Sequence, residues 1–255
     1  MIEAYIAEQS KKHELLLMTH IVIGYPSLSA SLEIVDAMVE AGVDVMELQI
    51  PFSEPIADGP VILRANQLSL ASGIRVDDCF RFAETVTKRH PIPFLFMGYY
   101  NTLFVRGVER FVGQMKQAGI RGAIVPDLPP EEGNRYLVAM ESQQLDPIFI
   151  FSPNTPASRM REIASHARGF VYCVARKGVT GKTTEFSADL AEYLQRCRAA
   201  TRLPIALGFG VRDRGDLAYL RGKVDMAVVG SETLRLVDAK GVEAIKPFIT
   251  QLIAT

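Results

Sequence analysis

The chain has 255 residues, with 28 basic and 29 acidic side chains, so its formal net charge is −1. A charge this close to zero argues against a nucleic acid as the main partner. Apolar residues make up 48% of the sequence, which is enough for a large core. The length fits one large α/β domain better than two small ones. We therefore expect residues 1–255 to form a single domain.

The cysteines and the N-terminal residues indicate the cellular compartment of the protein. Cys79, Cys173 and Cys197 are scattered, form no CxxC pair and belong to no cluster with metal-ligand spacing. Reduced thiols in a cytosolic protein are the simplest interpretation. The first residues lack a basic region followed by an apolar stretch, and no run reaches the ~18 apolar residues of a membrane span. We expect a cytoplasmic protein with no bound metal and no membrane partner.

Short apolar runs alternate with longer amphipathic stretches along the whole chain. The apolar runs predict strands at 16–23, 43–50, 93–98, 122–126, 147–151, 169–174, 204–208 and 226–229. The amphipathic stretches predict helices at 32–41, 76–89, 108–118, 130–143, 157–167, 188–199, 213–221 and 242–253. Eight strands, each followed by a helix, indicate a (β/α)8 TIM barrel. A doubly wound open sheet shares the alternation, but eight units favour the barrel.

The end of the second predicted strand carries one of two neighbouring acids. Glu47 lies late in the strand, and Asp58 follows beyond a loop that Pro51 and Pro55 stiffen. Two carboxylates beside one apolar strand end suit proton transfer, because their surroundings can set the acidity of each separately. The alternative is an ordinary strand-end residue and an ordinary turn residue. Since glycosidases also use two carboxylates, the pair does not identify a substrate.

Glycines follow the seventh and eighth predicted strands. Gly210 belongs to the first of these loops, and Gly230 precedes Ser231 in the second. Loops of this kind expose backbone N–H groups at a helix N-terminus, and in barrels they are the usual phosphate site. We therefore predict phosphate binding here, although the glycines can also serve only to let the chain turn.

Other strand ends carry candidates with a plainer alternative. The polar loop after the sixth strand, with Thr180 and Gly181, is typical of a mobile lid or of a surface loop. Tyr99 ends the third strand and can line an apolar pocket or belong to the core. Asp127 ends the fourth and can support the site or cap the next helix. His20 falls inside the first strand, where a satisfied core histidine is the favoured interpretation.

Several of these segments together resemble the alpha subunit of tryptophan synthase over nearly the full length of the chain. The matching motifs, in chain order, are Gly24-x-Pro26-Ser27, Glu47-Leu48, Pro51-Phe52-Ser53, Ala57-Asp58-Gly59-Pro60, Tyr99-x-Asn101, Pro126-Asp127-Leu128-Pro129, Gly178-Val179-Thr180-Gly181, Gly208-Phe209-Gly210 and Gly230-Ser231. Any one motif alone is modest evidence. All of them in order, at the ends of barrel strands, form a specific pattern.

The resemblance implies a cofactor-independent retro-aldol cleavage of indole-3-glycerol phosphate to indole and glyceraldehyde 3-phosphate. Glu47 matches the acid–base catalyst, and Asp58 matches the acid that hydrogen-bonds the indole N–H. Thr180 matches the lid residue that helps to hold this aspartate. The phosphate-binding positions of the family match Gly181, Phe209, Gly210, Gly230 and Ser231. Those lining the indole and glycerol region match Tyr99 and Tyr172.

The resemblance also implies an αββα assembly, in which indole passes through a tunnel to a pyridoxal-phosphate-carrying beta subunit. The chain departs from the family pattern near the acids. Gln49 stands where the family usually has Gly, Glu54 where it has Asp, and Leu63 where it has Gln. Two other functions therefore stay open. One is a catalytically weak chain that mainly activates a beta subunit, and the other is a freestanding indole-releasing lyase.

Overall fold

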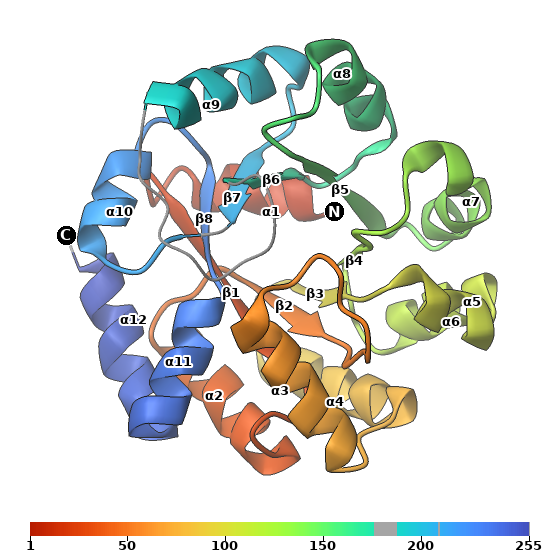
Figure 1. Cartoon of the computed structure of the whole chain (residues 1–255), viewed down its shortest axis with the longest axis vertical. Helices are drawn as coiled ribbons and strands as arrows, with labels where there is room; N and C mark the ends of the chain where they lie inside the picture. Colours follow the sequence, from red (N-terminus) through yellow and green to blue (C-terminus); the bar gives the residue numbers. More distant parts are fainter. Residues whose placement is uncertain (176–187, 209, 255) are drawn as a thin grey trace.

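The computed structural model describes all residues except 176–187, 209 and 255 (Figure 1). Eight parallel strands pair in chain order, and β8 closes onto β1, so the sheet is a closed barrel. The strands are β1 (Leu16–Val22), β2 (Val45–Gln49), β3 (Phe94–Met97), β4 (Gly122–Ile124), β5 (Asp146–Phe151), β6 (Val171–Val174), β7 (Ile205–Gly208) and β8 (Met226–Val229). The predicted (β/α)8 barrel is confirmed, and the open sheet is excluded.

Helices surround the barrel (Figure 1). They are α1 (Ile2–Gln9), α2 (Leu28–Glu40), α3 (Pro60–Ala71), α4 (Val76–Arg89), α5 (Tyr100–Arg106), α6 (Val108–Gln117), α7 (Asn134–Ser142), α8 (Ala157–His166), α9 (Ala188–Ala200), α10 (Arg214–Leu220), α11 (Ser231–Lys240) and α12 (Ile245–Ile253), with short 3₁₀ turns η1 (Pro130–Glu132) and η2 (Val242–Ala244). The eight predicted helices all exist. The sequence patterns missed α1, α3, α5 and α11.

The strands are buried on both faces, which explains their nearly unbroken apolar sequences. One buried cluster fills the space between the strands and the surrounding helices. A second fills the barrel interior, where Met18, Val45 and Leu95 meet. Ile2 and Ile6 of α1 belong to this second cluster, so α1 closes the barrel at the N-terminal ends of the strands. The opposite end is left for the site.

Turn residues set where several elements begin and end. Gly42 and Gly119 end helices with φ of 99° and 77°, values that favour glycine over residues with a side chain. Gly59 differs, because its φ is −89° and it caps α3 with Pro60 in the first turn. The segment after Asp58 is therefore a helix start, which fixes the far end of the acid-bearing loop.

Three further findings concern membrane spans, metal ligands and thiols in the described residues. No helix among them is long and apolar enough to cross a membrane. Within the same part of the chain, no group of three or more His, Cys, Asp or Glu side chains could hold a metal ion. Cys79, Cys173 and Cys197 are all buried free thiols.

Candidate active site

The first acid lies inside the barrel near the C-terminal end of β2. Glu47 is only 5% exposed, and the pairing of β1 with β2 sets it opposite His20. The His20 Nδ1 and Glu47 Oε1 atoms are 2.7 Å apart, within hydrogen-bonding distance. His20 is therefore a core residue, as expected, but its ring nitrogens are only partly satisfied among the described residues. It contacts the predicted catalytic acid, and its other ring nitrogen, Nε2, has no partner among the described residues.

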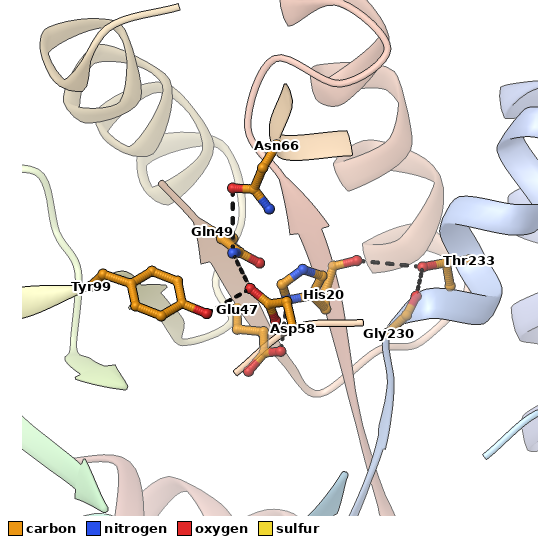
Figure 2. A network of polar contacts seen from close by, with 8 residues as sticks. All are labelled: His20, Glu47, Gln49, Asp58, Asn66, Tyr99, Gly230 and Thr233. Atoms are coloured by element: carbon orange, nitrogen blue, oxygen red, sulfur yellow. Dashed lines mark hydrogen bonds and ion pairs between the residues drawn. The ribbon is translucent and has the colours of Figure 1, made fainter. Parts of the chain in front are cut away.

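The second acid reaches the same place from the loop between β2 and α3. Asp58 Oδ2 accepts hydrogen bonds from Gln49 Nε2 at 2.7 Å and from the Tyr99 hydroxyl at 3.0 Å. The Tyr99 hydroxyl in turn accepts the Ala57 N–H at 3.1 Å, so the tyrosine holds both the acid and its loop. Figure 2 shows Tyr99 on one side of the two acids and Gly230 on the other.

The start of the loop is anchored by a buried amide and a ring contact. The Oδ1 atom of Asn66 in α3 accepts a hydrogen bond from the Phe52 N–H at 2.9 Å and another from Gln49 Nε2 at 3.4 Å. The Phe52 ring stacks on Tyr99 with centroids 5.0 Å apart, a favourable offset for aromatic pairs. Because both ends of the loop are fixed in this way, Asp58 is held against β2 and β3.

Burial and the neighbouring polar groups shift the pKa values of Asp58 and His20 in opposite directions. Burial raises the pKa of Asp58, while the charge of His20 and the hydrogen bonds from Gln49 and Tyr99 lower it; burial is the largest effect and the pKa is raised. Burial lowers the pKa of His20, but the hydrogen bond and charge of Glu47, together with Asp58 and Gln49, outweigh it. The raised pKa of His20 favours an imidazolium between two acids.

Tyr172 of β6 faces the two acids from across the barrel. Burial raises the pKa of its hydroxyl well above the usual value, and the charges of Glu47 and Asp58 raise it further. The ring lies against Gly208 at the end of β7, where a Cβ would come within 2.3 Å of the tyrosine oxygen. Glycine is therefore required at position 208 for the tyrosine to occupy its place.

The predicted phosphate end lies at the ends of β7 and β8. Gly230 follows β8, and Ser231 is the first residue of α11, whose N-terminus is suited to an anion. Thr233 donates to the Gly230 carbonyl at 2.7 Å and to the His20 carbonyl at 3.4 Å, which ties this end to β1. Gly210 has a φ of 108°, a conformation that favours glycine.

The structure thus brings the described candidates Glu47, Asp58, Tyr99, Tyr172, Gly210, Gly230 and Ser231 to the C-terminal ends of the strands. Thr180, Gly181 and Phe209 lie outside the described residues. Asp127 accepts the Tyr100 N–H at 2.9 Å and so caps α5, which precedes it in the chain. The prediction that it caps the next helix is therefore wrong.

Sequence reasoning missed the contacts that His20 and Gln49 make with the acids. One signal was available, since both are polar residues inside otherwise apolar strands. His20 lies two residues before the end of β1, and Glu47 lies two residues before the end of β2. Because the two strands pair in register, this equal spacing sets the two side chains opposite each other.

A closed barrel that gathers a buried and a half-buried acid at its C-terminal rim defines a barrel enzyme of the acid–base type. Comparison with known proteins sharpens this class. Residues 6–252 match the family described as tryptophan synthase alpha chain. The alpha chain of Desulforapulum autotrophicum is 62% identical over 252 residues, covering 99% of this chain and 100% of the relative. That of Syntrophotalea carbinolica is 59% identical with the same coverage.

Solved structures agree with the sequence matches. Tryptophan synthase of Mycobacterium tuberculosis matches with a TM-score of 0.93 at 30% identity, covering 99% of this chain and 96% of that chain. A tryptophan synthase complex from Pyrococcus furiosus matches with a TM-score of 0.86 at 27% identity, covering 93% and 97%. The chain belongs to the tryptophan synthase alpha chain family and is a carbon–carbon lyase of tryptophan biosynthesis.

Proposed function

We propose that this chain cleaves indole-3-glycerol phosphate to indole and glyceraldehyde 3-phosphate, with Glu47 and Asp58 as its catalytic residues. The observation that carries the proposal is the hydrogen-bonded network that holds both acids at one end of the barrel (Figure 2). Family membership supplies the substrate. The network supplies two carboxylates in different surroundings, as proton transfer requires.

Each acid has one part of the chemistry. The Glu47 carboxylate removes the proton of the side-chain hydroxyl next to the bond that breaks and delivers this proton to C3 of the indole ring. The electrons of that carbon–carbon bond return to the ring and release indole, while the hydroxyl carbon becomes the aldehyde of glyceraldehyde 3-phosphate. Asp58 accepts the indole N–H and stabilises the positive charge that develops on the protonated ring.

The remaining predicted residues position the substrate. The phosphate is assigned to the loops after β7 and β8, through Gly210, Gly230 and the helix start at Ser231, together with Gly181 and Phe209. Tyr99 and Tyr172 line the indole and glycerol region, and Thr180 helps to hold Asp58. The position of Gly230 beside His20 supports this arrangement, because it sets the anion site next to the acid pair.

We also assign a tryptophan synthase beta subunit as the partner, in an αββα assembly that receives the indole. The solved neighbours from Mycobacterium tuberculosis and Pyrococcus furiosus are tryptophan synthase structures, one of them described as a complex. Exposed apolar side chains on the acid-bearing loop and on α5 suit a protein contact, since Ile56 is 72% exposed and Phe104 is 61% exposed. Glu54 belongs to the same loop.

A single domain over residues 1–255 and a cytoplasmic location complete the proposal. The closed barrel supports the first, because its last helix packs back on α2 beside β1. The three free cysteines support the second.

The deciding experiment measures indole release from indole-3-glycerol phosphate, with and without a beta subunit. We expect release by the natural protein and a loss of about 10²- to 10⁴-fold in kcat for Glu47→Gln, the usual contribution of a general acid–base group. Circular dichroism checks that the variant is folded. Natural kcat in the folded Glu47→Gln variant would remove the assigned role.

The same assay separates the two alternative functions. A chain that only activates its partner stimulates the beta reaction and releases no indole. A freestanding lyase releases indole at an unchanged rate when the beta subunit is added, and the two proteins elute separately in size-exclusion chromatography.

A further inference from the structure

Each of the two acids is held by a polar side chain of a neighbouring barrel strand. His20 holds Glu47, and Gln49 holds Asp58. Between these two pairs lie two buried atoms without a hydrogen-bond partner among the described residues, His20 Nε2 and Gln49 Oε1. The two atoms are complementary, because a protonated imidazole donates through Nε2 and an amide oxygen accepts.

We propose that His20 is a positioning residue that carries a positive charge, holds Glu47 directly and Asp58 through Gln49, and balances the negative charge of both acids. This inference rests on the proposed cleavage reaction, for which it assigns a role to a residue that does not touch the substrate. Figure 2 shows the imidazole between the acids and the Gly230–Thr233 turn.

The electrostatic argument starts from burial. Two carboxylates in one water-poor site repel each other and lose hydration, so burial without a counter-charge drives one of them to take up a proton. In the described part of the chain, no lysine or arginine forms an ion pair with Glu47 or Asp58; the ion pair of Glu47 is with His20. His20 is 2% exposed, so solvent screens its charge little.

The groups that face His20 all favour its protonated form or are uncharged. Glu47 on β2 and Asp58 on the following loop act as negative charges and raise the pKa of His20, against the opposing effect of burial. Tyr99, which follows β3, and Tyr172 of β6 face the acids, and because burial raises the pKa of both hydroxyls they stay neutral in the working range. On the β8 side, the neighbour is the uncharged Gly230.

The charge of His20 matters for the second acid as well as the first. Burial is the largest effect on Asp58 and raises its pKa, and His20 is the next largest and lowers it. Loss of the imidazolium therefore raises the pKa of Asp58 further. A protonated Asp58 stabilises the positively charged indole ring less well, so the reaction loses its electrostatic support as pH falls.

The test compares pH profiles of indole release for the natural protein, His20→Leu and His20→Asn. The asparagine keeps an N–H donor near the Nδ1 position, without a charge. We expect both variants to move the acidic limb of kcat upward by about one to three pH units, the effect of an opposite charge at this range. At a fixed pH on the acidic limb this is at least a ~10-fold loss of kcat, and the loss shrinks as pH rises above that limb. KM changes less than ~3-fold, because His20 does not touch the substrate.

Thr19→Val serves as the matched control. Thr19 is buried next to His20 on β1, and its hydroxyl has no partner among the described residues. The change alters the packing of the same strand without altering charge, so the pH profile is expected to stay in place. A natural profile in His20→Asn would show that hydrogen bonding alone suffices and would overturn the charge assignment. An equal loss at every pH in both His20 variants would indicate a purely structural role and would also overturn it.

A titration that needs no turnover separates this inference from the proposed function. The chain has only four histidines, so ¹⁵N signals of the His20 imidazole can be assigned by comparison with His20→Asn. We expect an imidazolium in the natural protein at pH 7.5. A neutral imidazole at that pH would refute the inference even if indole is released. An imidazolium in a protein that releases no indole would sustain the charge assignment and refute the proposed function.

Discussion

Both ends of the barrel bury an acid, but they hold it with different kinds of donor. At the closed end, Asp146 at the start of β5 is 2% exposed and accepts the Ile2 N–H at 2.7 Å. At the open end, Glu47 is 5% exposed and is held by the side chain of His20 at the same distance. The burial and the bond lengths are alike. The donors are a backbone amide in one case and a titratable ring in the other.

Because of this difference, we assign Asp146 to stability and Glu47 to catalysis. A backbone N–H cannot lose its proton in the working range, so Asp146 serves as a fixed cap for the first turn of α1. Burial raises the pKa of Asp146, and the Ile2 N–H and the N-terminal charge only partly offset this. The imidazole of His20 at the open end can change its charge, which leaves the acidity of the site adjustable.

After Glu47→Gln, the largest effect is expected from replacement of the second acid at the open end. Asp58→Asn should lower kcat for indole release by about 10²- to 10³-fold, the usual loss when a group that stabilises transition-state charge is removed. Because the change removes a half-buried carboxyl with a raised pKa, the urea midpoint at pH 8 should not fall. A large loss of stability with kcat retained would reverse the assignment of the two ends.

The matching change at the closed end should act on stability alone. Asp146→Ala leaves the buried Ile2 N–H without its acceptor and should lower the free energy of unfolding by about 1–3 kcal/mol. Urea denaturation measures this loss, and kcat at 25 °C should remain within ~2-fold of the natural value. Asp146→Asn keeps an acceptor and is the control with the smaller loss. A drop in kcat as large as that of Asp58→Asn would show that the two ends are coupled.

A smaller effect is expected from Tyr99→Phe, which removes one of the two donors to Asp58. The tyrosine hydroxyl lowers the pKa of Asp58, so its loss should raise that pKa. The acidic limb of the kcat profile should therefore move upward by about one pH unit, which is a ~10-fold loss at the low end and little change at pH 8. A loss that is the same at every pH would point to the displaced loop at Ala57 instead.

Much of the fold was visible in the sequence, because it depends on local patterns. All eight strands lie within the predicted ranges or one residue beyond them, and α4 has the predicted bounds of 76–89. Helices α1, α3, α5 and α11 were missed for local reasons. Helix α3 follows a proline-rich segment and itself begins with a proline, a composition that is also typical of a loop. Helix α5 has only seven residues and no strong apolar stripe. Helix α11 starts in the turn that was assigned to phosphate.

The candidate site was visible only in part. Strand-end position identified Glu47, Asp58 and Tyr99 as candidates, since the ends of parallel barrel strands meet at one rim. The link from His20 to Glu47 depends on the register of β1 against β2, which brings residues 27 positions apart into contact. Local sequence does not encode that register. The side chain of Gln49 likewise reaches Asp58 only because the intervening loop folds back.

The contact between Gly208 and Tyr172 makes these two positions a single unit for protein engineering. A methyl group at 208 would enter the space of the tyrosine ring, so the ring must move or be replaced by a smaller side chain. Libraries that vary position 208 while holding Tyr172 fixed would recover few folded members. Paired substitutions at 208 and 172 are the route by which the pocket wall on this side can be reshaped for bulkier indole derivatives.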